Sequence, residues 1–266
     1  MNVAVTSFEP ADRHVPVGLE QVLFLYINLD RSPERRTDIE RQLQALGVNA
    51  ARVAGVDGVA VWPQVSEETK QRFRSCHGRE LRPGEVGCYD SHLRAMDMFL
   101  ASSFSHAIIL EDDALIPDTP DVLQKLFAQG AAQSWDFLRL HSRRDYLSLP
   151  VQALDATYGL HVNLTRSTGA TAYALNRQAA QALRQSLAQI EVPYDHAFDR
   201  PHHFGLKYRH LKPDLFHVAG HPSTIETAPS VKQPALRKVP TLFWRMRSEM
   251  GRFVWSVLNY LRYRQA

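Results

Sequence analysis

The chain has 266 residues, of which 44% are hydrophobic and 22% are charged. This composition is typical of a soluble globular protein, and it excludes a disordered chain, a collagen-like fibre and a multi-span membrane protein. The 31 basic and 28 acidic residues give a net charge of +3, which is too small to indicate a nucleic-acid partner. Seven basic residues and one acidic residue lie between Arg237 and Ala266, so this segment carries +6 and residues 1–236 carry −3.

The two cysteines, Cys76 and Cys88, are too few for a disulfide framework. The sequence has neither a CxxC motif nor a Cys/His spacing typical of zinc sites, so we expect a reduced compartment. The first residues lack the basic and long apolar regions of a signal peptide, and no run reaches the ~18 apolar residues of a membrane span. These features predict a cytoplasmic protein.

The first elements predict a strand followed by a turn and a helix. Residues 1–20 are polar and are expected to form a loose leader. The apolar run from Val22 to Leu29 is short and rich in β-branched and aromatic residues, as in a buried strand. Ser32 is a good N-cap and Pro33 suits the first helical position, so a helix is expected to run to Leu46 and end at Gly47.

The remaining elements continue this alternation. Strands are expected at residues 51–56, 107–110, 135–140 and 169–175 and near Leu211, and helices at 85–100, 121–127 and 176–188. Residues 60–82 fit no clear pattern. Alternating strands and helices predict an α/β fold, with a largely parallel sheet that has helices on both faces. Ligands bind such sheets outside the carboxyl ends of the strands.

The first polar cluster at a strand end is Glu111-Asp112-Asp113, directly after the strand at 107–110. Three adjacent carboxylates repel one another, and a bound cation lowers that cost. Mg²⁺ and Mn²⁺ prefer oxygen ligands and often share them with substrate phosphates. The alternative is a loop with solvated acidic side chains.

The second cluster spans Asn28 to Arg36, where the first strand meets the first helix, and includes Asp30, Arg31 and Arg35. Guanidinium groups and a helix N-terminus can hold a phosphate, and Asp30 or Asn28 can bond a ribose or a base edge. The alternative is a capped surface helix with an exposed basic face.

Two further stretches carry candidate side chains. Residues 84–92 place Glu85, Asp90, Ser91 and His92 near a helix start, but adjacent helical residues diverge, so Ser91 and His92 do not form a catalytic pair. Cys88 is predicted to be a small core residue rather than a nucleophile. Residues 194–203 hold Asp195, His196, Asp199, His202 and His203, which allow a zinc or non-haem iron site, with His217 and His221 as additional ligands. The simpler hypothesis is that Asp195 acts alone as a general base.

The basic tail predicts an amphipathic helix over residues 241–264. At 100° per residue, one face is apolar (Phe243, Met246, Met250, Val254, Val257, Leu261) and the opposite face is polar (Arg245, Ser248, Arg252, Asn259). Trp244 and Trp255 add to a pattern that fits attachment to an anionic membrane surface. A helix packed on its own domain remains the alternative.

Taken in order, several motifs resemble glycosyltransferase family 25, which includes bacterial lipopolysaccharide-type galactosyltransferases and is related to collagen galactosyltransferase domains. They cover about residues 22–226: Ile27-Asn-Leu-Asp-Arg-Ser-Pro-Glu-Arg-Arg36, Gly84-Glu-Val-Gly-Cys88 with Ser91-His92, Ile108-Ile-Leu-Glu-Asp-Asp113, Gly169-Ala-Thr-Ala-Tyr-Ala-Leu175, Val192-Pro-Tyr-Asp195 and, more faintly, Ser223-Thr-Ile225.

The resemblance implies a GT-A-like, Rossmann-type fold with a mixed, mainly parallel sheet, a UDP-sugar donor and transfer with inversion. It implies Mn²⁺ or Mg²⁺ at the acidic motif, with Glu111, Asp113 and His221 as ligands. Asp195 would be the catalytic base, and Glu85, Ser91 and His92 would line the donor and acceptor pocket. The donor-binding residues would be Asn28, Asp30, Arg31, Arg36, Asp57 and Asp112.

We therefore expect a leader (1–20), a catalytic domain (21–236) and a C-terminal helix (237–266). The expected activity moves galactose from a UDP-sugar to a glycan or lipid-linked saccharide in envelope polysaccharide synthesis. The helix would hold this cytoplasmic enzyme on the inner face of the cytoplasmic membrane. Another donor, such as UDP-glucose or a UDP-N-acetylhexosamine, and a catalytically silent membrane-docked relative are the alternatives.

Overall fold

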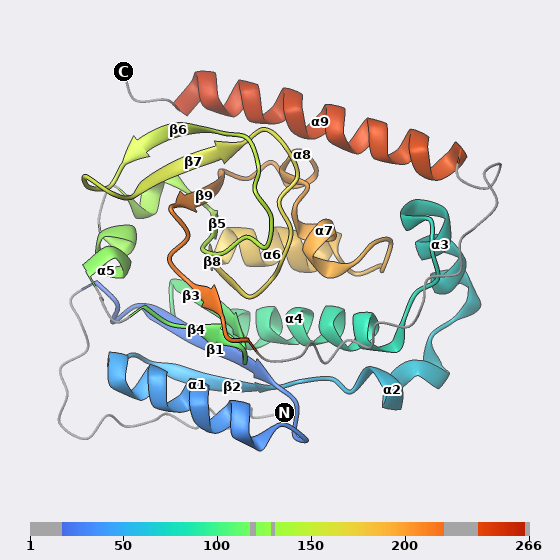
Figure 1. The fold of residues 1–266 in the computed structure, drawn as a ribbon, viewed down its shortest axis with the longest axis horizontal. Coiled ribbons are helices and arrows are strands. Elements are labelled where there is room, and N and C mark those ends of the chain that lie inside the picture. Colours follow the sequence, from blue (N-terminus) through green and yellow to red (C-terminus); the bar gives the residue numbers. More distant parts are fainter. Residues whose placement is uncertain (1–17, 118–120, 129–130, 221–238, 264–266) are drawn as a thin grey trace.

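The computed structural model describes residues 18–117, 121–128, 131–220 and 239–263. Most of the expected leader, His221 and the Ser223-Thr-Ile225 motif lie outside these ranges. The described residues form a mixed α/β fold in which one large sheet is flanked by helices and a long helix lies at the C-terminal end (Figure 1). The expected fold class is confirmed.

The central sheet has eight strands in the order β2-β1-β3-β8-β5-β9-β7-β6. The pairings show that six strands run in one direction, while β8 and β7 run in the other. A second, two-stranded sheet joins β4 and β10. The bounds are β1 Val22–Asn28, β2 Ala50–Ala54, β3 His106–Glu111, β4 Ala114–Leu115, β5 Phe137–Arg139, β6 Ser148–Ala153, β7 Gly159–Asn163, β8 Ala172–Asn176, β9 Tyr208–Lys212 and β10 His217–Val218.

Helices cover both faces of the sheet because successive side chains of the central strands point to opposite faces. Phe24 and Tyr26 of β1 pack on the face covered by α1 and α5, whereas Leu23 and Leu25 pack on the face covered by α4 and α6. The helices are α1 Pro33–Leu46, α2 Gly58–Val61, α3 Glu67–His77, α4 Pro83–Ala101, α5 Asp121–Phe127, α6 Arg177–Ser186, α7 Tyr194–Phe198, α8 Pro201–Phe204 and α9 Val239–Tyr263; Trp62–Gln64 and Ala132–Ser134 are short 3₁₀ helices.

The predicted strand, turn and helix from Val22 to Gly47 are present. Gly47 ends α1 in the left-handed conformation with φ of 70°, and its N–H donates to Leu43 O at 3.1 Å. Ser32 occupies the predicted N-cap position but makes no side-chain capping bond. The expected cap contact is therefore wrong, and Pro33, whose missing N–H needs no partner, begins the helix.

Two glycines let α2 lie directly against α4. A Cβ at Gly58 would lie 1.8 Å from Pro83 O, and one at Gly87 would lie 2.5 Å from Val56 O. Only a residue without a side chain fits at either position. This contact fixes the N-terminal half of α4, which carries Glu85, Ser91 and His92, against the segment that follows β2.

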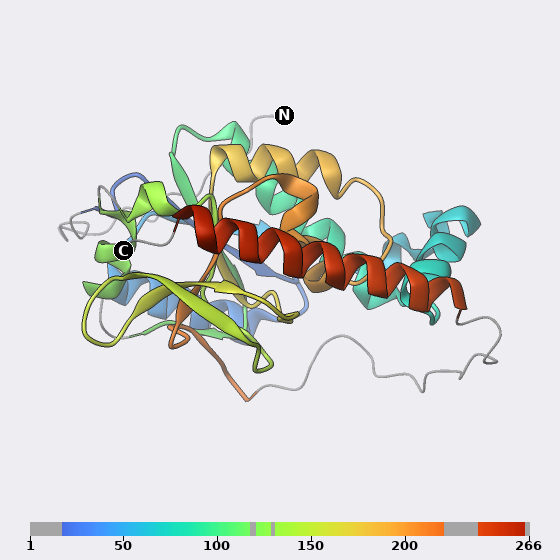
Figure 2. The same cartoon turned by 90° about the horizontal axis from the view of Figure 1, so that it is seen from above.

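The C-terminal helix α9 lies across one side of the molecule and contacts α3, α8, β6 and β7 (Figures 1 and 2). Its polar face points inward, where Ser248, Arg252 and Asn259 are buried. Arg245, predicted on this face, is instead exposed and donates to His77 O at 2.7 Å. Most of the predicted apolar face points outward: Phe243, Met246, Met250, Val254 and Leu261 are exposed, whereas Val257 is half-buried. Among the described helices, α9 included, none is sufficiently long and apolar to cross a membrane.

Candidate active site

A pocket of about 460 Å³ opens at the edge of the sheet where β1, β3 and β5 end. Parallel neighbours β1 and β3 place Ile27 opposite Glu111, so the two polar clusters predicted at strand ends come together. Because β8 runs antiparallel to β3 and β5, the loop before β8 lies at the same edge and forms another wall of the pocket. The ends of β1, β3 and β5 and the loop before β8 therefore surround one cavity.

The acidic motif and the first cluster are joined by direct contacts. Asn28, which is buried, donates through Nδ2 to Asp112 Oδ2 at 2.7 Å, and Arg35 Nη1 lies 3.1 Å from Asp112 Oδ1. Arg31 lines the pocket and pairs with Asp57, which also caps α2. Asp112 is therefore held in place by the protein itself.

Asp113 has a different environment. Its Oδ1 is buried and has no hydrogen-bond partner among the residues that the structure describes. Burial, with repulsion from Glu111 and then Asp112, raises the pKa of Asp113 to about 6. An unsatisfied carboxylate oxygen beside two further acids suits a hard divalent cation, because such a cation supplies the missing partner and offsets the repulsion. Glu111 and Asp113 therefore fit the predicted metal site.

Several predicted residues take other positions. Asp30 pairs with Arg52 at 2.5 Å and Arg36 with Glu40 at 2.8 Å. Neither Asp30, Arg36 nor Asp57 is among the pocket-lining residues. Within residues 194–203, Asp195 and His196 line the pocket, whereas Asp199, His202 and His203 do not. The structure therefore does not gather this stretch into the zinc or iron site that the sequence allowed.

The three residues predicted from α4 all line the pocket. Glu85 is buried, accepts from Arg82 N at 3.1 Å and pairs with Arg79. Ser91 is also buried, with its hydroxyl bonded to Val56 N at 2.8 Å and to Gly87 O at 2.6 Å. These contacts hold α4 in position, so Glu85 and Ser91 chiefly shape the wall of the pocket.

His92 is enclosed by aromatic side chains. Its ring stacks on Tyr194 with centroids 4.1 Å apart, and Nδ1 lies 3.0 Å from the Tyr173 hydroxyl. The Tyr173 and Tyr194 hydroxyls are 2.9 Å apart, and burial raises the pKa of both tyrosines well above the usual value. The hydroxyls therefore stay neutral and fix the orientation of the imidazole.

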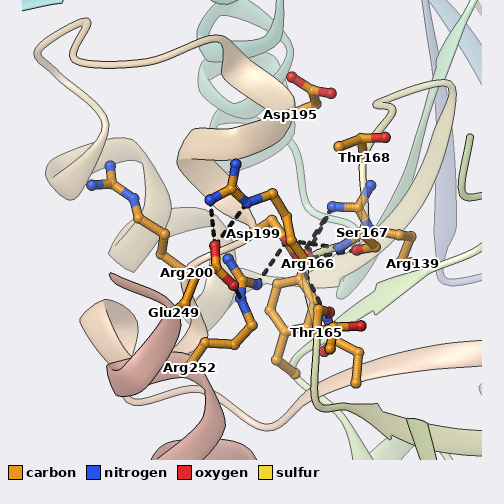
Figure 3. A network of polar contacts seen from close by, with 12 residues as sticks. Arg139, Thr165, Arg166, Ser167, Thr168, Asp195, Asp199, Arg200, Glu249 and Arg252 are labelled. Atoms are coloured by element: carbon orange, nitrogen blue, oxygen red, sulfur yellow. Dashed lines mark hydrogen bonds and ion pairs between the residues drawn. The ribbon is translucent and has the colours of Figure 1, made fainter. Parts of the chain in front are cut away.

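Asp195 lies on α7 with one carboxylate oxygen held by the backbone. Gly169 N donates to Asp195 Oδ2 at 2.9 Å. The loop that carries Gly169 is fixed from behind by buried charges: Arg139 donates to Gly169 O, and Asp199 accepts from Ser167 N at 3.1 Å and from Ser167 Oγ at 3.0 Å. Figure 3 shows that Arg252 of α9 reaches this network.

Sequence reasoning missed basic side chains at the pocket. Arg143 and Arg144 follow β5 and line the pocket, and neither forms an ion pair within the described ranges. His77 was also missed: it lines the pocket and meets His196 edge to face with ring centroids 5.4 Å apart, and burial lowers its pKa to about 3, so its ring is neutral. The end of the predicted strand at 135–140 was the available signal for the two arginines, because β5 ends at the same edge as β1 and β3.

Comparison with known sequences identifies the family. The sequence model described as "Glycosyltransferase family 25 (LPS biosynthesis protein)" matches residues 22–198, which include the acidic motif, α4 and Asp195. The chain belongs to glycosyltransferase family 25. The recognition made from the motifs is thus confirmed, and the pocket described above is the candidate active site of a family 25 glycosyltransferase.

Three curated relatives illustrate the similarity. A "Glycosyltransferase 25 family member" of Drosophila melanogaster is 35% identical over 92 residues, which cover 33% of this chain and 15% of that protein. "Procollagen galactosyltransferase 1" of Danio rerio is 25% identical over 175 residues (63% and 28%). "Inactive glycosyltransferase 25 family member 3" of Homo sapiens is 26% identical over 197 residues (70% and 32%). The matched part of the chain spans less than a third of the length of these relatives.

Proposed function

We propose that the protein is a metal-dependent, inverting hexosyltransferase that moves galactose from UDP-galactose to a glycan or lipid-linked saccharide in envelope polysaccharide synthesis. The observation that carries the proposal is the meeting of Glu111, Asp112 and Asp113 with pocket arginines and Asp195 around one cavity. The description of the family as an LPS biosynthesis protein and the name of the zebrafish relative support the galactose donor and the envelope setting.

The donor diphosphate is the first ligand that this pocket must hold. Its negative charge increases as the sugar–phosphate bond breaks, and guanidinium groups stabilise such charge. Arg31, Arg35, Arg143 and Arg144 line the pocket and can contact the phosphates. Mn²⁺ or Mg²⁺, held by Glu111 and Asp113, would neutralise the same developing charge.

Asp195 would act on the acceptor. A sugar hydroxyl is a weak nucleophile, and a carboxylate within hydrogen-bond distance assists by taking its proton. Gly169 N–H holds Asp195 Oδ2 at 2.9 Å, which leaves Oδ1 for the acceptor hydroxyl. Because inversion needs a single displacement, the enzyme requires no nucleophile of its own. The buried, hydrogen-bonded Ser91 and the neutral Cys88 thiol, whose pKa burial raises, agree with this mechanism.

The experiment that tests the proposal measures UDP released from UDP-galactose in the presence of Mn²⁺ and a saccharide acceptor. Asp113→Ala is expected to abolish release without changing the circular dichroism spectrum. Asp38→Ala, at a partly exposed α1 residue outside the pocket, is expected to retain wild-type release. Near-normal turnover of Asp113→Ala would contradict the metal assignment. UDP-glucose and UDP-N-acetylhexosamines, tested in parallel, decide between donors.

The second candidate function is that of a catalytically silent, membrane-docked protein. The name of the human relative, which describes it as inactive, supports this candidate. The presence of the full acidic motif and pocket arginines argues against it, because a silent protein has no need of them. Absence of binding to any UDP-sugar with metal present would support this candidate.

We also propose that α9 attaches the cytoplasmic enzyme to the anionic inner face of the cytoplasmic membrane. Its outward side exposes Leu242, Phe243, Met246, Met250, Phe253, Val254, Leu258 and Leu261 by 51–70%. Arg245, Arg247 and Arg262 are exposed on the same helix, and each basic side chain near an anionic surface contributes about 1 kcal/mol. An apolar face flanked by arginines matches a lipid surface in both hydrophobicity and charge.

Co-sedimentation with vesicles rich in phosphatidylglycerol tests this attachment. Phe243→Ser combined with Met250→Ser is expected to weaken binding at least about tenfold, while Val59→Ser, a 68% exposed apolar residue on α2, leaves it unchanged. Equal binding of all variants would refute the role of α9. Deletion of the helix is a poor test because it would remove the buried Arg252.

A further inference from the structure

One group of side chains on the pocket wall has a chemistry different from that of the acidic motif. Cys88, His92 and Glu111 offer a thiol sulfur, an imidazole nitrogen and a carboxylate oxygen that all lie within 4.8 Å of one another. All three residues line the pocket. Within the part of the chain that the structure describes, no other group of three or more His, Cys, Asp and Glu residues places its ligand atoms this close together.

Two elements create this arrangement. Cys88 and His92 lie four residues apart on α4, so they share one face of the helix. Glu111 ends β3, and His92 Nε2 lies 3.4 Å from Glu111 Oε1. The third ligand comes from a separate strand, which explains why no zinc-type spacing is visible along the sequence.

The orientation of His92 is set from the side opposite the pocket. Nδ1 lies 3.0 Å from the Tyr173 hydroxyl, and that hydroxyl lies 2.9 Å from the Tyr194 hydroxyl. If Nδ1 donates to Tyr173, Tyr173 can donate to Tyr194, and the lone pair of Nε2 then faces Glu111. Metal-binding histidines are held in this way, with the second ring nitrogen bonded to a fixed partner.

We propose that Cys88, His92 and Glu111 bind one thiophilic divalent cation of the Zn²⁺ class, with its remaining coordination position open to the pocket. Binding converts the Cys88 thiol to a thiolate and releases its proton to solvent. Three protein ligands and one open position are typical of zinc sites that also contact substrate. The site is distinct from the proposed Mn²⁺ or Mg²⁺ position, which uses oxygen ligands alone, although Glu111 belongs to both.

Cobalt substitution tests the proposal directly, because thiolate bound to Co²⁺ gives a near-ultraviolet charge-transfer band and oxygen ligands alone do not. Metal-free protein is titrated with Co²⁺ and then with Zn²⁺. We expect the band in the wild type, its loss when Zn²⁺ is added, and its absence in Cys88→Ser. Cys76→Ala is the matched control, since Cys76 is the other free cysteine and lies outside the pocket.

A second variant probes the orientation of the imidazole. Tyr173→Phe removes the hydroxyl that contacts His92 Nδ1 and is expected to lower Co²⁺ affinity about 10- to 100-fold while leaving the band position unchanged. Circular dichroism spectra confirm that each variant is folded. No charge-transfer band in folded wild-type protein, or an equal band in Cys88→Ser, would overturn the proposal.

The cobalt titration and the glycosyltransfer assay test separate claims, and either one can fail without the other. A protein that transfers galactose with Mn²⁺ and shows no cobalt–thiolate band would refute this site and keep the proposed function. A protein with the band but without any transfer would keep the site and refute the function.

Discussion

The buried charges beneath the candidate site connect α9 to the pocket. Asp199 is fully buried and lies 2.7 Å from Arg252 Nη1 and 3.6 Å from Arg139 Nη2, and both arginines are 1% exposed (Figure 3). Glu249 pairs with Arg252 at 3.3 Å and also with Arg166. Arg252 thus ties the inward face of α9 to the residue that holds the Ser167 backbone.

Substitution of Arg252 by Met removes the charge and keeps most of the aliphatic length. Removing one partner of a buried ion pair costs about 3–5 kcal/mol, because the other charge remains buried. Arg139 and the Ser167 donors still contact Asp199 in the variant, so we expect the lower end, about 3 kcal/mol. For a chain of this size that loss lowers the melting temperature by about 6–12 °C.

Urea unfolding followed by circular dichroism gives the free energy of unfolding of each variant. Arg247→Met is the matched control: Arg247 is exposed on the same helix, and its loss is expected to change stability by less than about 0.5 kcal/mol. If Arg252→Met also stays within about 0.5 kcal/mol of the wild type, the inward orientation of the polar face of α9 is refuted.

Two further predictions concern the acidic residues of the site. Without bound metal, burial and then repulsion from Glu111 raise the pKa of Asp113 from 3.8 to about 6, so unfolding is measured in EDTA. The folded state therefore holds its proton more tightly, and stability falls as pH rises from about 4 to 6. Asp113→Asn should therefore be about 1–3 kcal/mol more stable than the wild type at pH 8 and equally stable at pH 4; a pH-independent difference in urea unfolding would contradict the buried, repelled carboxylate. Asp195→Asn should lower turnover at least about 10²-fold with little change in the dissociation constant of UDP-galactose, and the reverse pattern in kinetics and calorimetry would make Asp195 a binding residue.

Short sequence patterns correctly predicted β1 and the end of α1. The run from Val22 to Leu29 is continuous and apolar because β1 is buried on both faces, and Gly47 marks the helix end since it adopts a positive φ. The hairpin of β6 and β7 was missed. β6 forms the edge of the sheet, carries Pro150 and has a mixed burial pattern, so its sequence resembles a loop.

The part of the candidate site that follows β1 and β3 could be predicted from the sequence. Asn28 and the acids after β3 could be expected at one edge because parallel strands share their carboxyl ends. The end of the strand predicted at 135–140 pointed to Arg143 and Arg144 as candidates, but their place at the pocket depends on the position of β5 beyond the antiparallel β8, which no pattern along the chain sets. The polar inner face of α9 was also ambiguous, since the helix pattern does not say which face turns inward.

The most direct test of the central claim is isothermal titration of UDP, then UDP-galactose, into the full chain with and without Mn²⁺. We predict micromolar binding that depends on Mn²⁺ and is lost in Asp113→Ala, because the carboxylates and arginines of the pocket would hold the diphosphate through the cation. Absence of binding for both ligands with Mn²⁺ present, or equal binding by Asp113→Ala, would contradict the account.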